Sequence, residues 1–222
     1  MKMARVKRIP VVTKLFLLGS MWVSWLTLQA QTPVEKFFLT MPVDELPVLP
    51  PDAREELVKL AHGGGEVVVA NLFGMPSRLV RFNDTGIRIN LTSSSWWEVR
   101  SLPTDTVPIF GVIHTFLKPV PASRIAFYTA DWQPLPDVFR MPDLGDFLDV
   151  PDSVFYLTRK HWVNVLVPQH VVAHWDEYVE EIVLEVNLQG LSHEERNGAE
   201  HVFRPVRLRW NKGRWEPVSG SF

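Results

Sequence analysis

Six short runs in which apolar and polar residues alternate, separated by turn residues, occupy the chain between residues 66 and 128. The runs are Val67–Phe73, Leu79–Phe82, Ile87–Leu91, Trp96–Leu102, Ile109–Phe116 and Ile125–Tyr128. Alternation with a period of two is typical of strands with one buried face. The connections are too short to hold crossover helices, so consecutive strands must pair directly. This pattern predicts an antiparallel β meander.

The turn between the second and third runs has the sequence Asn83-Asp84-Thr85-Gly86. Asparagine and glycine tolerate the positive φ angles that tight hairpins use, so we expect positive φ in this turn. In the run that follows, Ile87, Ile89 and Leu91 share one face of the strand.

Helical spacing precedes the sheet. Apolar residues recur every three to four positions in Pro33–Met41, and Pro42 ends this first predicted helix. A second helix follows a proline-rich connection: Asp52 and Glu55 resemble a capping box at its start, and Gly63–Gly65 end it.

After Tyr128, the proline-rich segment Pro134–Pro142 interrupts the strands, and a candidate sub-boundary lies near residues 134–152. We expect a short helix over Asp143–Leu148 and further strands at Val154–Leu157 and Trp162–Val167. Alternation over Ile182–Leu188 predicts a long strand with one polar face.

The chain closes with a capped helix and a hairpin. Ser192 and Glu195 have capping-box spacing, and Phe203–Trp210 can pair with Arg214–Val218 through an Asn-Lys-Gly turn. The predicted fold class is therefore α+β: mostly an antiparallel β meander, with N-terminal helices and a C-terminal β-hairpin.

Residues 1–30 have the organisation of an export signal. Five basic residues lie within Met1–Lys14, an apolar segment follows over Leu15–Leu28, and Ala30 offers a cleavage point. The apolar segment is shorter than the roughly 20 residues that span a bilayer, which favours cleavage over a retained anchor. We therefore expect a single mature domain, residues 31–222, without a membrane span, in the periplasm or on the cell surface.

Composition excludes several function classes for residues 31–222. They hold 18 basic and 25 acidic residues, a net charge of −7, which argues against binding to nucleic acid or to anionic lipid. The chain has no cysteine, so a disulfide framework, a thiolate metal site and a cysteine nucleophile are all excluded. No nucleophile elbow, phosphate loop or dinucleotide fingerprint occurs, so we predict neither catalytic residues nor a cofactor.

Three segments carry a resemblance to a known family. They are Phe37-Phe38-x-x-Met41-Pro42 with Leu46-Pro47-x-Leu49, then Ser123–Tyr128 with Trp132 and Leu135, and finally Leu191–Arg196 with Arg207-x-Arg209-Trp210-Asn211. Together they resemble the uncharacterised "domain of unknown function 3256" family. The resemblance implies export by Gram-negative bacteria of the gut and oral type, and it implies no activity. Relatives often carry a cysteine where this chain has Phe116–Pro119.

Two groups of residues are candidates for metal ligands. His170 and His174 would share a face of a helix, with Glu177 following, and zinc accepts such ligands. On a strand the two rings would be about 13 Å apart, and the alternative is two loop histidines. The series Asp143, Asp146, Asp149 and Asp152 could bind calcium, although Asp143 as a helix cap and Asp152 as a turn residue are the simpler interpretations.

Adjacent tryptophans supply a binding hypothesis. Trp96 and Trp97 must point to opposite faces of a strand, so both are core residues only if both faces of the sheet are covered. An exposed ring could stack on a sugar or anchor a protein.

The sequence thus predicts an exported envelope protein that acts as a non-catalytic binding or interaction module, whose partner is an envelope protein or a glycan. The alternatives are a metal-dependent envelope hydrolase and a carbohydrate-binding module that uses exposed tryptophan.

Overall fold

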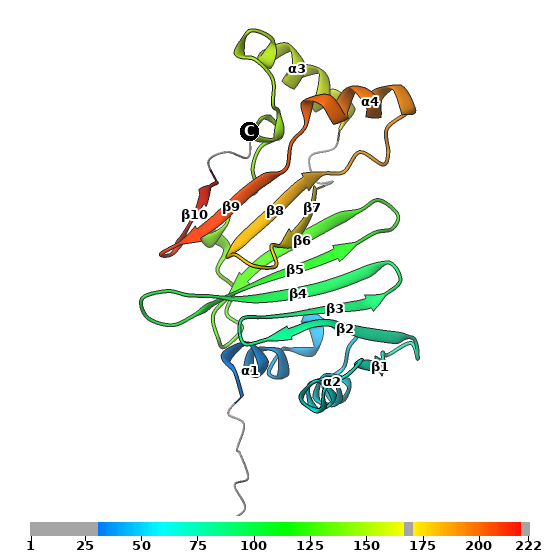
Figure 1. Cartoon of the computed structure of the whole chain (residues 1–222), viewed down its shortest axis with the longest axis vertical. Coiled ribbons are helices and arrows are strands. Elements are labelled where there is room, and N and C mark those ends of the chain that lie inside the picture. Colours follow the sequence, from blue (N-terminus) through cyan, green and yellow to red (C-terminus); the bar gives the residue numbers. More distant parts are fainter. Residues whose placement is uncertain (1–30, 167–170, 219–222) are drawn as a thin grey trace, which may run out of the picture. The chain divides into compact units, whose positions relative to one another are not determined.

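Two N-terminal helices pack on one face of a six-stranded sheet (Figure 1). The computed structural model describes residues 31–166 and 171–218, so the predicted signal segment and His170 lie outside the described residues. Helix α1 spans Pro33–Leu39, the 3₁₀ turn η2 spans Val43–Glu45, and α2 spans Pro51–Gly63. Both predicted helices are therefore confirmed.

The two helices begin differently. In α1 the Thr32 side chain caps the first turn by accepting a hydrogen bond from the backbone N–H of Glu35 (3.2 Å). In α2 the N-cap is Pro50, with no side-chain cap. The predicted capping box of Asp52 and Glu55 is wrong, because Pro51 already supplies the fixed φ of a first helical position and places the N-cap at Pro50, two residues earlier.

The six-stranded sheet is a meander in chain order, with every neighbouring pair antiparallel. Its strands are β1 (Val68–Ala70), β2 (Pro76–Asn83), β3 (Gly86–Thr92), β4 (Ser95–Leu102), β5 (Ile109–Phe116) and β6 (Ala122–Tyr128). Each of the six alternating runs corresponds to one strand. The first strand is shorter than its run, because the chain turns after Ala70.

The β2–β3 turn forms without positive φ. None of Asn83, Asp84, Thr85 and Gly86 is in the left-handed region. Instead, the Asn83 side-chain oxygen accepts hydrogen bonds from the backbone N–H groups of Thr85 (3.1 Å) and Gly86 (2.8 Å). The prediction of positive φ was wrong because the asparagine side chain itself closes the turn.

A helix replaces the two strands predicted at Val154–Leu157 and Trp162–Val167. Helix α3 spans Asp152–Val165 and follows two 3₁₀ turns, η3 (Pro136–Val138) and η4 (Leu144–Phe147). Its inward stripe contains Phe155, Trp162 and Val165. The intervening residues 158–161 lack glycine, proline or asparagine, so nothing breaks the chain there. Short apolar runs fit either structure, and here the helical period holds.

The second sheet has four antiparallel strands in the order β10-β9-β8-β7. They are β7 (Val171–Trp175), β8 (Glu181–Val186), β9 (Val206–Asn211) and β10 (Arg214–Pro217), with helix α4 (His193–Val202) between β8 and β9. The capping box of Ser192 and Glu195 is confirmed. The terminal hairpin is also confirmed, and Lys212 and Gly213 supply its two positive φ angles.

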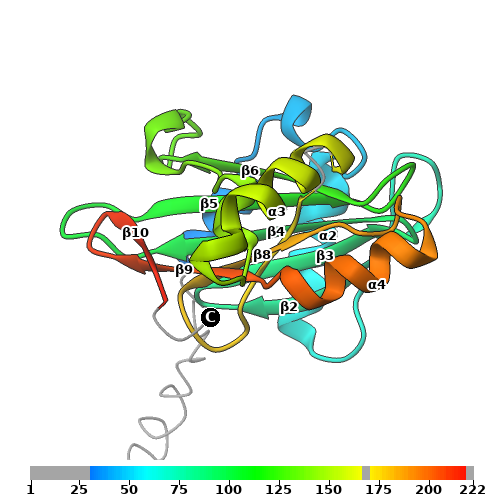
Figure 2. The same ribbon diagram turned by 90° about the horizontal axis from the view of Figure 1, so that it is seen from above.

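Two hydrophobic cores result. One lies between α1, α2 and the first face of the six-stranded sheet. The other lies between the opposite face of that sheet and the four-stranded sheet, with contributions from α3 and α4 (Figure 2). The fold class is therefore α+β with antiparallel strands, as predicted. Residues 134–152 lie in the connection between the two sheets, and the candidate sub-boundary there stays a prediction.

Strand β7 lies against the six-stranded sheet through side chains. The Ser123 hydroxyl accepts a hydrogen bond from the backbone N–H of Ala173 (2.8 Å), and Thr115 and Ser123 both approach the Ala173 carbonyl at 3.4 Å. At the same junction the Trp175 ring packs on Gly111, where a side chain would collide with it. These contacts join the two sheets.

Candidate functional site

The adjacent tryptophans point to opposite faces of β4, as predicted. Trp97 is only 1% exposed and packs against Phe38 in the first core, with ring centroids 5.6 Å apart. Trp97 therefore has no free face for a ligand. Trp96 is half-buried: the Arg88 guanidinium lies over its ring at 5.3 Å, and its Nε1 donates to Glu98 (3.0 Å). A binding role for Trp96 stays a prediction.

Beside Trp96, charged groups are buried between the two sheets. Glu98 and Arg100 are almost fully buried. Burial raises the pKa of the Glu98 carboxyl, and the nearby charges of Arg88 and Arg81 act in the opposite direction. Burial likewise lowers the pKa of Arg100. In this cluster one side-chain atom each of Glu98, Arg88 and Arg100 is buried without a hydrogen-bond partner among the described residues.

The predicted metal ligands are only partly within the described residues. His174 lies on strand β7, opposite Val183, and burial lowers its pKa. Glu177, in the β7–β8 connection, forms an ion pair with Arg81 (3.4 Å). In the described ranges, 31–166 and 171–218, no group of three or more histidine, aspartate or glutamate side chains could hold a metal ion. The pairing of His174 with His170 stays a prediction.

The aspartate series has local structural roles. Asp143 and Asp146 form a capping box around η4. Asp149 forms an ion pair with Arg204 (3.3 Å), and Asp152 is the first residue of α3. Because three of these carboxylates already have protein partners, the simpler interpretation as caps fits better than a calcium site.

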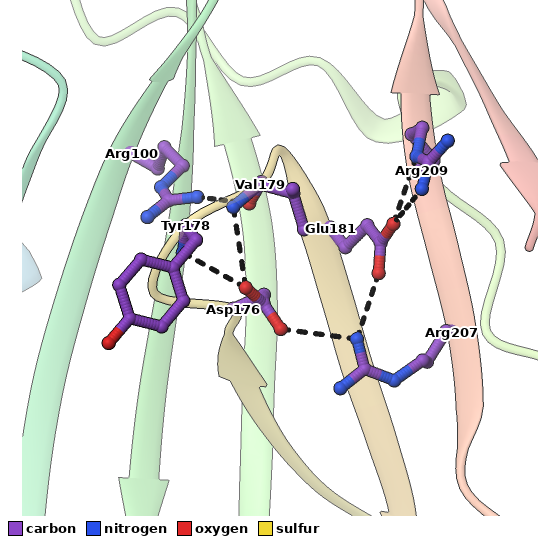
Figure 3. A network of polar contacts seen from close by, with 7 residues as sticks. All are labelled: Arg100, Asp176, Tyr178, Val179, Glu181, Arg207 and Arg209. Atoms are coloured by element: carbon purple, nitrogen blue, oxygen red, sulfur yellow. Dashed lines mark hydrogen bonds and ion pairs between the residues drawn. The ribbon is translucent and has the colours of Figure 1, made fainter.

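The β7–β8 connection carries a dense polar network (Figure 3). Arg207 donates to Asp176 (3.1 Å) and to Glu181 (2.9 Å), and Arg209 makes two further bonds to Glu181 (2.9 and 2.6 Å). These carboxylates raise the pKa of Arg207. Arg100 of β4 reaches across to donate to the Val179 carbonyl.

Backbone groups complete this network. The N–H groups of Tyr178 (2.9 Å) and Val179 (3.3 Å) donate to Asp176. The bond from Tyr178 is the main cause that lowers the pKa of Asp176. The network thus holds the connection in place and ties β8 to β9. Its charged side chains bond to one another or to backbone groups of the protein.

A cleft of about 870 Å³ lies between the segment 137–149 and the strands β9 and β10. Apolar side chains of the second core, among them Phe147, Phe155, Leu208 and Trp215, contribute to its lining. Charged residues line it as well: Asp137, Arg140, Asp143, Asp146, Asp149, Arg204, Arg207 and Arg214. A cavity of this size is typical of small-ligand sites.

Most of these charged groups already have partners. Arg204 pairs with Asp149, and Arg214 pairs with Glu216 (2.8 Å). In contrast, Arg140 and Asp137 form no hydrogen bond or ion pair with any described residue. The buried Nε1 of Trp215 also has no partner among the described residues. Asp137 and Arg140 are exposed and are therefore available to a ligand, whereas the Trp215 Nε1 is buried.

The residue types of the lining limit the chemistry that the cleft can support. Its described lining contains no serine, threonine, cysteine, histidine, lysine or tyrosine. A hydroxyl or thiol nucleophile paired with an imidazole base therefore cannot be assembled from these residues. Guanidinium, carboxylate and indole groups remain, and these suit the recognition of charged and flat ligands.

Sequence reasoning missed this cleft. The aspartates of segment 143–152 were considered only as calcium ligands, and no role was predicted for the nearby Arg140. The opposite wall comes from residues 204–218, more than fifty residues further along the chain. The one available signal was a charged, proline-rich segment with exposed polar groups next to aromatic residues.

Comparisons place the chain among proteins without an assigned function. No curated protein matches the sequence. A solved domain of an uncharacterized protein from Porphyromonas gingivalis W83 is similar in structure, with a TM-score of 0.72 and 25% sequence identity over 85% of this chain and 98% of that chain. The model of the family described as "Protein of unknown function (DUF3256)" matches residues 25–215. The chain therefore belongs to the DUF3256 family.

Proposed function

We propose that this protein is exported to the bacterial envelope, in the periplasm or on the cell surface, and binds a partner there without catalysing a reaction. The signal-like organisation of residues 1–30 supports export. No helix in the described part of the chain is long and apolar enough to cross a membrane.

The cleft between segment 137–149 and the β9–β10 hairpin carries the binding proposal. It combines an apolar lining with two exposed and unpartnered charged groups, Arg140 and Asp137. Ligand sites commonly have this composition: a mostly apolar wall and a few polar groups that orient the ligand. An envelope glycan and an extended segment of an envelope protein both offer suitable groups.

Export is tested by producing the full chain in a Gram-negative host and measuring the mass and location of the product. Cleavage after Ala30 and recovery with the periplasmic or surface fraction are expected. Recovery of the uncleaved chain in the cytoplasm would refute the export proposal and leave the cleft proposal intact.

Binding is tested by a thermal-shift screen of envelope glycans and acidic peptides, because a ligand of the native state raises the melting temperature. A true ligand of the cleft should bind Arg140→Ala about tenfold more weakly or worse, since this change removes a charge-assisted bond. The matched control is Arg78→Ala, an exposed arginine on β2 that does not line the cleft. Equal affinity of both variants for every hit would refute the cleft assignment, and chemical turnover of a hit would favour the hydrolase alternative.

A further inference from the structure

The connection between β1 and β2, whose two strands are labelled in Figure 1, carries three large apolar side chains that are exposed to solvent. Leu72 is 62% exposed, Phe73 72% and Met75 44%. We call these three residues the apolar tip. None of them belongs to either hydrophobic core or packs against one. Polar residues at these positions would leave the described cores unchanged, so folding does not explain their apolar character.

The backbone beneath the apolar tip is held rigidly. The Asn71 side-chain oxygen accepts bonds from the N–H groups of Phe73 (3.0 Å) and Met75 (3.1 Å), and its amide group donates to the Leu91 carbonyl (3.0 Å). Asn71 and Met75 also pair through the backbone (2.8 Å), and the N–H of Gly74 donates to Asn71 (2.8 Å). Asn71 itself is buried.

The remaining N–H group of this connection, that of Leu72, donates to the Val48 carbonyl (3.0 Å). All five N–H groups of residues 71–75 are thus bonded within the protein. An unbonded N–H is costly in an apolar medium, where water cannot replace the missing partner. This segment can enter such a medium without breaking or losing a hydrogen bond of any N–H group.

The sequence on both sides of the tip carries no net charge. Residues 67–77 contain no charged side chain. The flanking Arg78 forms an ion pair with Glu66 from the residues just before β1. Residues 31–222 carry a net charge of −7, which disfavours an anionic surface at long range. An uncharged surface imposes no such penalty.

We propose that the apolar tip inserts into the surface of a lipid bilayer with zwitterionic head groups. A protein partner is less well matched, because interface hot spots are rich in tryptophan, tyrosine and arginine, whereas the tip offers leucine, phenylalanine and methionine and no free N–H donor. The insertion docks the domain at a membrane surface. It does not depend on the ligand of the cleft or on the proposed function.

Insertion is tested directly with a fluorophore, since the chain has no cysteine and any introduced cysteine is unique. The full chain carrying Met75→Cys is labelled with a nitrobenzoxadiazole dye and mixed with vesicles of phosphatidylcholine and phosphatidylethanolamine. We expect a blue shift and a severalfold rise in emission. The matched control is Tyr156→Cys on α3, a position that is 72% exposed, where the emission should not change.

A second measurement uses co-sedimentation with the same vesicles. Leu72→Ser/Phe73→Ser should reduce the bound fraction by about tenfold or more, because two apolar side chains no longer leave water on binding. The control Tyr156→Ser/Leu157→Ser removes two equally exposed apolar side chains from α3 and should bind as the wild type does. Residues 1–30 are present in every variant, so a difference between variants belongs to the substituted site.

Three results would overturn the proposal: an unchanged emission at position 75, an equal change at positions 75 and 156, or equal sedimentation of the two double variants. A tip that instead binds another protein would give the first of these results with vesicles. Melting curves check that each variant is folded, and the exposed positions of all substitutions predict melting temperatures close to that of the wild type.

Discussion

Gly111 is the position where the smallest possible side chain should disturb the junction of the two sheets. A Cβ atom at this residue would lie 2.5 Å from Cζ2 and 2.8 Å from Cη2 of Trp175, and 2.8 Å from Cε1 of Phe127. Carbon atoms in contact normally sit about 3.5–4.0 Å apart. Gly111→Ala therefore requires a shift of both rings by about 1 Å.

The rings have little room for this shift. Trp175 and Phe127 are both almost fully buried in the second core. The Arg100 guanidinium also lies over the Trp175 ring at 5.7 Å. Overpacking of such a site typically costs about 1–3 kcal/mol. The φ angle of Gly111 lies outside the left-handed region, so alanine recovers about 0.4–1 kcal/mol through the unfolded chain.

The net expectation is a loss of about 1–2 kcal/mol in the free energy of unfolding. For a domain of this size, this corresponds to a melting temperature lower by about 2–8 °C. Urea and thermal unfolding, followed by tryptophan fluorescence and circular dichroism, measure both quantities. Gly190→Ala is the matched control, because no atom lies within 4 Å of its added Cβ, and it should be neutral or slightly stabilising.

A double-mutant cycle isolates the cause. Trp175→Leu removes the ring that the new Cβ would meet, so Gly111→Ala should cost less in that background than in the wild type. If Gly111→Ala is as stable as the wild type, or if its cost is unchanged by Trp175→Leu, the sheet junction is not packed as described and the reasoning fails.

The remaining predictions concern charge and capping. Burial, aided by a nearby arginine, lowers the pKa of His114 to about 4. The neutral form of His114 therefore stabilises the fold above pH ~6.5, and that contribution disappears as the pH falls towards 4. In His114→Gln the free energy of unfolding in urea should depend less on pH over this window, and a pH dependence equal to that of the wild type would contradict the prediction. Glu181 is buried while its partners Arg207 and Arg209 are partly exposed. Arg207→Ala/Arg209→Ala should therefore lower the free energy of unfolding by several kcal/mol, and by more than Glu181→Gln does, because only the double arginine variant leaves a buried carboxylate without its partners. The reverse order in chemical denaturation would refute this. Ser192→Ala should cost about 1 kcal/mol through the lost cap of α4, and Ser153→Ala, at an exposed position in the first turn of α3, is the comparison with no cap to lose.

Local sequence was sufficient where one short segment holds both the pattern and the partner. The meander follows from alternation interrupted by turns, and the capping box of Ser192 and Glu195 lies within four residues. Local signals led to wrong predictions where one segment is compatible with two different structures. Asn83 closes its turn with a side chain where positive φ was expected. Val154–Leu157 belongs to a helix of which only Phe155, within this run, packs against the second core, while the other three residues are exposed.

The sequence by itself determined the class of this fold and the way the strands of the six-stranded sheet connect, because hairpin pairing depends on neighbours in the chain. Only the tertiary structure decided the rest. Trp97 became core and Trp96 lay beneath Arg88 because each face of β4 is covered by a different layer. The cleft exists because segment 137–149 meets β9 and β10 across more than fifty residues. Likewise, the apolar tip is recognisable only by the exposure of its side chains. In the sequence, apolar residues of a strand cannot be distinguished from those of a projecting loop until the burial of each side chain is known.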